Sequence, residues 1–198
     1  MKNYQFISVF IFIALTSCGG KVKTFEFAGG TFSYAISHDP TTFLARKVTD
    51  VYSASVVYQV LEGLTCLDPI TLEPQPSLAK SWTISEDGLT VVFQIKEGIY
   101  FHDNDITGNQ RELTAADILY SIELACTQVM GEEPSSAYSG IYKGLIEGVE
   151  EFYLGEVDKI SGIQISGNEI TMGLTKPDAS FLDKLASANA SVVLREAV

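Results

Sequence analysis

The chain has 198 residues, of which 46% are hydrophobic and 19% are charged, a balance typical of a globular protein and not of a disordered one. Acidic residues outnumber basic residues by 25 to 13, which gives a formal net charge of −12 at pH 7. This charge argues against nucleic acid and anionic lipid headgroups as partners, because both repel an acidic surface. It does not select any particular small ligand.

An apolar segment opens the chain. Residues 6–15 are mostly apolar, but the run is too short to span ~30 Å of hydrocarbon as a helix, so it predicts a cleavable export signal. The small residues Thr16 and Ser17 come directly before Cys18, a pattern that resembles the lipobox of bacterial lipoproteins. That resemblance implies that Cys18 is acylated and becomes the first residue of the mature protein. An ordinary secreted protein with a free Cys18 is the alternative.

These features predict three parts along the chain. We expect a lipoprotein signal peptide at 1–17, a lipidated tether at 18–24 and an exported domain at 25–198. The expected location is outside the cytoplasm, in the periplasmic space or on the cell surface, anchored to a bacterial membrane by the lipid.

The first predicted elements of the exported domain are a strand and a helix. Residues 31–37 (TFSYAIS) alternate as a strand does, and Pro40 prevents regular continuation. Asp50 is a suitable N-cap for a helix that runs to about Glu62, and Gly63 is expected to end it.

Turn residues then predict two β-hairpins. Residues 86–88 (Glu-Asp-Gly) separate the apolar runs SWTIS and LTVVFQI, and residues 167–168 (Gly-Asn) separate two later runs. Trp82 and Phe93 stand on the two strands of the first hairpin, so we expect them to share a core.

Two further helices are predicted around these hairpins. Thr114 and Asp117 have the spacing of a capping box, which predicts a helix start at Thr114. Residues 132–144 are interpreted as a loop, and Pro177 suits the first turn of a last helix that runs through Leu185. The order of elements indicates a mixed α/β (α+β) fold, since a purely parallel sheet would need crossovers in place of hairpins.

Four sequence blocks between Tyr58 and Ser121 carry a family resemblance. They read YQVLEGL, SLAKSW, EDGLTVVFQIKEGIYFHD and RELTAADILYS, in that order. Together they resemble the extracellular solute-binding proteins of family 5, the peptide- and nickel-binding components of bacterial ABC importers. The resemblance implies a fold like that of the class II periplasmic binding proteins, with the first part of lobe I and its inserted small domain. Because family members are usually much longer, we expect the second lobe to be absent and the domain to be incomplete after Val198.

The resemblance also implies a function. A substrate-binding lipoprotein of this kind captures short peptides, or a related small solute, outside the cytoplasmic membrane and delivers them to the permease subunits of an ABC importer. We expect it to act as a monomer. Two alternatives stay open: a surface sensor or scaffold lipoprotein that reuses the fold, and a truncated fragment that binds nothing.

The resemblance places the ligand-facing residues in two loops. By position in the family, the loop after the first strand faces the ligand, and a residue of the later loop lies near another such position. Within the first loop, Arg46 and Lys47 would favour a peptide carboxylate, although they could instead be a solvated basic pair. The candidate ligand-binding residues are Phe43, Leu44, Arg46, Lys47, Val48, Thr49 and Tyr138.

The remaining cysteines leave a disulfide open. An exported pair could be oxidised, but Cys66 falls on a predicted strand and Cys126 late in a predicted helix, and nothing in the sequence brings them together. Two buried, unpaired thiols are the favoured interpretation.

Other chemistries find little support. His102 stands beside Asp103 and Asp105, but His38 and His102 are the only histidines and no Cys-Xaa-Xaa-Cys occurs, so we expect a polar turn and no metal site. The chain also lacks a nucleophile elbow, a P-loop and a dinucleotide-binding glycine motif. We therefore expect no cofactor and no enzymatic activity.

Overall fold

A computed structural model of the protein describes residues 30–31, 33–102, 106–108 and 110–198. The chain divides into two units, Met1–Ala35 and Ile36–Val198. The described residues of the first unit form no helix or strand. The expected signal peptide, the tether and the lipidated Cys18 lie outside the described residues, so they stay predictions.

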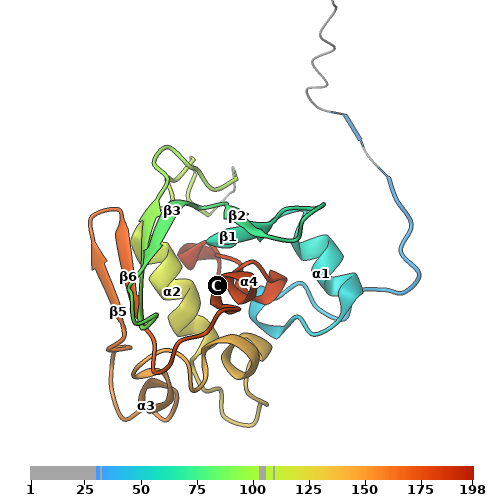
Figure 1. The fold of residues 1–198 in the computed structure, drawn as a ribbon. Helices are drawn as coiled ribbons and strands as arrows, with labels where there is room; N and C mark the ends of the chain where they lie inside the picture. The colour runs from blue at the N-terminus through green and yellow to red at the C-terminus, as the bar shows by residue number, and fades with distance from the viewer. Residues whose placement is uncertain (1–29, 32, 103–105, 109) are drawn as a thin grey trace, which may run out of the picture. The chain divides into compact units, whose positions relative to one another are not determined.

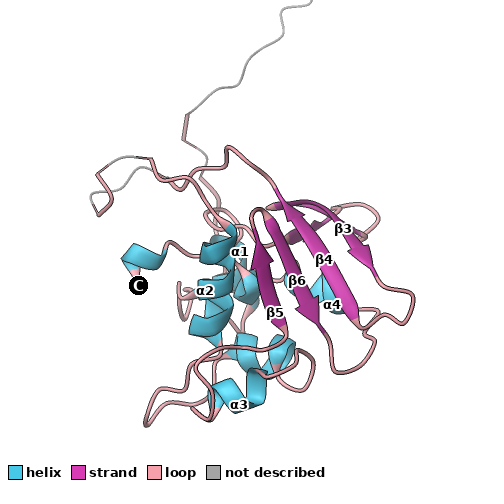
Figure 2. Cartoon of the chain, turned by 90° about the vertical axis from the view of Figure 1, so that its left-hand side faces the viewer, coloured by secondary structure: helices cyan, strands magenta, loops and turns pink. Residues whose placement is uncertain are grey.

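The second unit contains a four-stranded antiparallel sheet (Figure 2). Its strands are β3 (Ala79–Ile84), β4 (Thr90–Ile95), β6 (Glu169–Gly173) and β5 (Ile163–Ser166), and they lie in the order β3-β4-β6-β5. The two predicted hairpins supply β3–β4 and β5–β6. The central pairing of β4 with β6 joins them across more than 70 residues of sequence.

The main hydrophobic core lies between this sheet and the longest helix, α2 (Ala115–Ala125) (Figure 1). Burial alternates along β4, because successive side chains of a strand point to opposite faces. Phe93, on β4, is fully buried, and the ring of Trp82 on β3 lies 6.5 Å from it between centroids. The prediction that Trp82 and Phe93 share a core is confirmed, although Trp82 is only partly buried.

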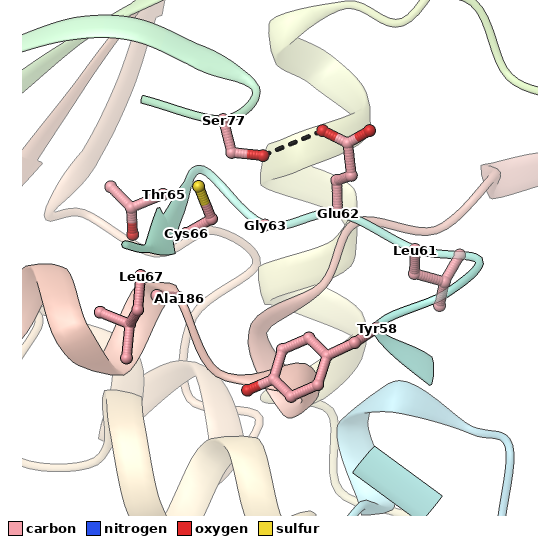
Figure 3. Close-up of a pocket in the computed structure, with 9 residues that line it drawn as sticks. All are labelled: Tyr58, Leu61, Glu62, Gly63, Thr65, Cys66, Leu67, Ser77 and Ala186. Atoms are coloured by element: carbon pink, nitrogen blue, oxygen red, sulfur yellow. Dashed lines mark hydrogen bonds between the residues drawn. The ribbon is translucent and has the colours of Figure 1, made fainter. Parts of the chain in front are cut away.

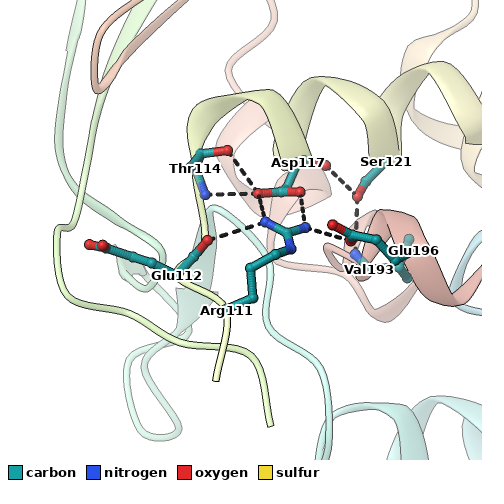
Figure 4. A network of polar contacts seen from close by, with 7 residues as sticks. All are labelled: Arg111, Glu112, Thr114, Asp117, Ser121, Val193 and Glu196. Carbon is teal, nitrogen blue, oxygen red and sulfur yellow. Dashed lines mark hydrogen bonds and ion pairs between the residues drawn. The ribbon is translucent and has the colours of Figure 1, made fainter. Parts of the chain in front are cut away.

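The start of α2 has the predicted capping box. Thr114 and Asp117 satisfy each other's backbone and side-chain groups, and the Thr114 hydroxyl lies 2.8 Å from Asp117. Arg111 also binds the Asp117 carboxylate, with its two terminal nitrogens 3.0 and 2.5 Å from the two oxygens (Figure 4). The same guanidinium reaches Glu196 at 2.9 Å, so this network joins α2 to the C-terminal segment.

Smaller elements surround the sheet and α2. They are a 3-10 turn η1 (Ala45–Lys47), helix α1 (Val51–Val57), the two-stranded ribbon β1 (Thr65–Leu67) and β2 (Pro74–Pro76), a π-helical turn η2 (Tyr138–Tyr142), helices α3 (Val149–Tyr153) and α4 (Phe181–Leu185), and 3-10 turns η3 (Ala188–Ala190) and η4 (Arg195–Ala197). A separate small core of Ala45, Val48, Val57 and Ala188 joins η1, α1 and η3.

The mixed α and β architecture is confirmed, but three element boundaries differ from the predictions. Residues 33–37 form no strand, because an alternating pattern needs a neighbouring edge and no strand among the described residues is paired with them. The helix that Asp50 caps ends at Val57 and not near Glu62, and the Leu61 N–H donates to the Val57 carbonyl in the turn that follows. The last helix begins at Phe181 and not at Pro177.

The prediction that both thiols are buried is wrong for one of them. Cys126 is fully buried and Cys66 is exposed, and both are free. Thr65, the neighbour of Cys66 on β1, is buried, and successive side chains of a strand point to opposite faces, so Cys66 points to the exposed face of the ribbon. Cys126 sits at the end of α2 inside the main core, where burial raises the pKa of its thiol to about 12. The loop predicted at 132–144 is also more regular than expected, since it contains η2.

Candidate functional site

Two adjoining concavities lie beside η1 and the start of α1. Their volumes are about 410 and 420 Å³, and both are lined by Thr49 and Ser136. We call them together the groove. The first is otherwise lined by Lys47, Glu132, Glu133 and Pro134, and the second by Val48, Asp50, Val51, Ala54, Tyr58, Ser187, Ala188 and Asn189.

Ser136 attaches the later loop to η1. Its hydroxyl lies 2.9 Å from the Arg46 carbonyl and 2.8 Å from the Val48 carbonyl, and it can donate to either. The Asn189 amide donates to the same hydroxyl at 3.5 Å. These contacts hold three segments, which are far apart in the sequence, around one concave surface.

Asp50 organises the start of α1. It caps α1 by accepting hydrogen bonds from the N–H groups of Tyr52 at 3.0 Å and Ser53 at 2.8 Å. The Thr41 hydroxyl donates to the second carboxylate oxygen at 2.6 Å. The Thr41 bond and the Ser53 bonds lower the pKa of Asp50 to about 2. The carboxylate is therefore ionised and already engaged in holding the loop in place.

The charges of the groove are mixed. Lys47 forms an ion pair with Glu132, and this contact lowers the pKa of the Glu132 carboxyl. Within the described part of the chain, the Arg46 guanidinium takes part in no ion pair. Arg46 is thus the cation of the predicted basic pair whose charge is less compensated.

The structure brings part of the predicted site together. Lys47, Val48 and Thr49 line the groove, whereas Arg46 lines a neighbouring concavity with Phe43 and Leu44. Phe43 and Leu44 are 65% and 52% exposed, so their apolar surface is open to a ligand or to a covering segment. The ligand contacts themselves stay predictions.

Two of the predicted residues have structural roles. Val48 is buried in the small core that η1 shares with α1 and η3. Tyr138 is 3% exposed, and its ring stacks on Tyr153 with centroids 4.0 Å apart. Burial raises the pKa of the Tyr138 phenol. A ligand contact by Tyr138 stays a prediction. The stacking of Tyr138 on Tyr153 packs η2 against α3.

Several groove residues escaped the sequence reasoning. Glu132, Glu133 and Ser136 belong to the loop that also holds Tyr138, so the position of that loop was the available signal. Ser187 and Asn189 carried no signal in the sequence, because they lie more than 130 residues after the η1 loop in the chain.

Neither a cluster of metal-binding side chains nor a membrane-spanning helix occurs among the described residues. No group of three or more metal-binding side chains occurs within the described ranges, and Asp103 and Asp105 lie outside them. Of the helices in the parts of the chain that the structure describes, none has the length and apolarity needed to cross a membrane.

Comparison with known protein sequences gives consistent matches. The family model described as bacterial extracellular solute-binding proteins, family 5 middle, matches residues 73–197. The chain is 34% identical over 127 residues to the dipeptide-binding protein of Escherichia coli strain K12, an alignment that covers 64% of this chain and 22% of that protein. It is 28% identical over 160 residues to heme-binding protein A of Haemophilus influenzae, which covers 80% and 28% of the two chains.

Solved structures show the same fold. The periplasmic binding protein DppA from Helicobacter pylori, in complex with the peptide STSA, matches with a TM-score of 0.68 and 25% identity over 80% of this chain and 30% of that chain. A periplasmic oligopeptide-binding protein, OppAIV from Borrelia burgdorferi, matches with a TM-score of 0.66 and 27% identity over 78% and 29%. The predicted fold class is confirmed, and this chain spans less than a third of these relatives.

Proposed function

Because this chain belongs to the bacterial extracellular solute-binding proteins of family 5, we propose that it is the substrate-binding component of an ABC importer for short peptides or a related small solute. It captures the solute outside the cytoplasmic membrane and delivers it to the permease. The observation that carries this proposal is the family match together with peptide-binding relatives of the same fold. These relatives favour an importer component over a sensor or a scaffold.

The groove is the surface that we assign to the solute. It is concave and mostly apolar, and it adds to this surface the hydroxyl groups of Thr49 and Ser136 and the amide of Asn189. Such groups suit the main chain of a peptide, which offers one donor and one acceptor per residue. Arg46 lines the neighbouring concavity and supplies a positive charge for a carboxylate.

A binding titration tests this assignment. Isothermal titration of the chain with a mixture of free dipeptides and tripeptides is expected to show saturable binding, and the same peptides with amidated C-termini are expected to bind more weakly. Replacing both Arg46 and Lys47 by Ala is expected to weaken binding of the free peptides. Lys80→Ala is the matched control, because Lys80 is an exposed lysine on β3, outside the groove. Equal affinities for the double variant and the control would remove the η1 loop from the site.

We also propose that the mature protein is held at a membrane by a lipid on Cys18. The support is the apolar segment of residues 6–15 and the small residues that precede this cysteine. Cys18→Ala is expected to abolish incorporation of labelled palmitate and to release the protein into the soluble fraction. A variant that stays in the membrane fraction and still takes up palmitate would contradict the proposal.

A further inference from the structure

The Lys47–Glu132 ion pair joins two segments that line the groove. Lys47 is the last residue of η1, and Glu132 lies in the loop that follows α2, 85 residues further along the chain. Both side chains belong to the wall of the same concavity, which has a volume of about 410 Å³. The ammonium of Lys47 therefore already has a carboxylate partner at the surface that we assign to the solute.

The position of Glu132 is fixed by its own loop. Gly131 has a φ of 81°, which favours glycine, and it lies in a turn closed by the hydrogen bond from the Glu132 N–H to the Val129 carbonyl at 3.1 Å. Further along the same loop, the hydroxyl of Ser136 attaches the chain to the backbone of the η1 loop. Because the turn and this attachment lie on either side of it, the Glu132 carboxylate is held beside Lys47.

The two cations of the η1 loop are not equally available to a ligand. The hydrogen bond and the charge of Lys47 lower the pKa of the Glu132 carboxyl, and the charge of Arg46 lowers it further. Arg46 itself forms no ion pair within the described residues. A ligand carboxylate can therefore pair with Arg46 directly, but it can pair with Lys47 only by displacing Glu132.

Carboxylates outnumber cations among the residues that line the groove. Lys47 is the basic residue of the lining, against Asp50, Glu132 and Glu133. Glu133 is exposed, and in the described part of the chain it takes part in no ion pair. A second negative charge on a ligand therefore meets repulsion that the lining does not offset.

The pocket that adjoins the groove at Tyr58 has a charge of the same sign (Figure 3). Tyr58 lines both the groove and this pocket, whose volume is about 370 Å³. The charged residue of the pocket is Glu62, and its carboxylate accepts a hydrogen bond from the Ser77 hydroxyl at 2.9 Å. A ligand that extends past Tyr58 therefore meets a further carboxylate and, among the residues that line this pocket, no cation.

We propose that Glu132 is a specificity-determining residue of the groove: because it occupies Lys47, the groove accepts short peptides or related solutes with neutral or basic side chains and discriminates against acidic side chains. This inference rests on the proposed function and names the class of solute that the same site accepts. The carboxylate at the C-terminus of such a peptide pairs with Arg46. An acidic side chain then has no second uncompensated cation among the described lining residues.

Isothermal titration with matched peptides measures this selectivity. The probes are the tripeptides Ala-Glu-Ala and Ala-Ala-Glu, and the same two peptides with Gln in place of Glu. Each Gln peptide has nearly the size of its Glu partner and lacks one negative charge, so the ratio of the two Kd values isolates the effect of that charge. The titrations use the whole chain at low ionic strength, where contacts between exposed charges are least screened.

The expected result is a charge preference that depends on Glu132. The parent chain is expected to bind a Gln peptide about two- to fivefold more tightly than its Glu partner, the range that exposed charge pairs supply. Glu132→Gln is expected to bring this ratio towards one by strengthening the binding of the Glu peptides, because Lys47 is then free. Glu132→Asp keeps the charge and is expected to keep the preference. The double variant Lys47→Met, Glu132→Gln is expected to restore the preference, because the freed cation is gone.

Glu86→Gln is the matched control. It removes the same charge from an exposed residue in the turn between β3 and β4, outside the groove, and is expected to leave the ratio unchanged. A second measurement needs no variant, since the ratio of the parent chain is expected to fall towards one as salt is added.

Four outcomes would overturn the inference while the proposed function stands. They are an unchanged ratio in Glu132→Gln, an equal change in Glu86→Gln, a parent chain that prefers the Glu peptides, and a ratio that does not depend on salt. If none of the peptides binds to the parent chain, the proposed function fails and the inference fails with it.

Discussion

Removing the Arg111 guanidinium is expected to destabilise the protein more than any other single loss of charge in the network of Figure 4. The Asp117 side chain is 5% exposed, and the two terminal nitrogens of Arg111 bind its two oxygens. Burial by itself would raise the pKa of Asp117, but the hydrogen bonds from Arg111 and Thr114 outweigh it and lower that pKa. The ionised carboxylate therefore depends on these donors.

The magnitude follows from the exposure of the pair. Breaking a fully buried ion pair costs ~3–5 kcal/mol, because one charge stays buried without its partner. Arg111 is 26% exposed, and the N–H and hydroxyl of Thr114 still bind Asp117 after the change. We therefore expect Arg111→Met, which keeps the aliphatic stem, to lower the free energy of unfolding by about 2–3 kcal/mol. For a domain of this size, the Tm would fall by roughly 4–12 °C.

Urea unfolding and thermal melts at pH 7 measure this loss, with Glu196→Gln as the matched control. Glu196 is 43% exposed and contacts the same guanidinium, so its replacement is expected to cost less than ~1 kcal/mol. The pKa of Asp117 is lowered in the folded state, so the stabilisation that it provides is present above the ordinary aspartate pKa and disappears as the pH falls below it. The stability gap between the protein and Arg111→Met is expected to shrink in acid. Equal melts for Arg111→Met and Glu196→Gln, or a gap independent of pH, would refute the reasoning.

Three further predictions concern other parts of the fold. The folded pKa of Asp50 is about 2, below its ordinary value of 3.8, so its contribution to stability is lost as the pH falls through this range. Asp50→Asn is therefore expected to lose less stability than the parent between pH 5 and pH 2 in urea titrations, and an identical loss would contradict this. Leu72 has a φ of 59° and is 66% exposed, so Leu72→Gly is expected to raise the free energy of unfolding by roughly 0.5–1 kcal/mol. A lower Tm for Leu72→Gly would show that the side chain stabilises the ribbon. Phe93→Ala is expected to cost ~3–5 kcal/mol, and Trp82→Ala less, because Phe93 is fully buried and Trp82 only partly. The reverse order in thermal melts would place Trp82 in the centre of the core.

The sequence by itself determined the local features of this protein. The two hairpin turns at 86–88 and 167–168, the N-cap Asp50 and the capping box at Thr114 were all predicted and found. Each depends on residues within a few positions of one another, so its chemistry is complete in a short stretch of sequence. The family resemblance carried by the blocks between 58 and 121 was likewise confirmed.

The tertiary structure decided what depends on distant partners. An alternating stretch becomes a strand only if an edge is available to it, and within the described ranges no strand pairs with residues 33–37. Distant partners also decide the burial of the two thiols. Cys126 faces the core formed by β4, β6 and α2, whereas Cys66 lies on the exposed face of a ribbon outside that sheet.

The candidate site shows this division most clearly. The sequence indicated the η1 loop, but the groove needs Ser136 and Asn189, which approach that loop from 87 or more residues away in the chain. Nothing in the local pattern of a serine or an asparagine specifies such a contact. It arises because the small core around Val48 and the η2 turn bring three separate segments to one surface, and packing of that kind depends on the whole fold and not on its local propensities.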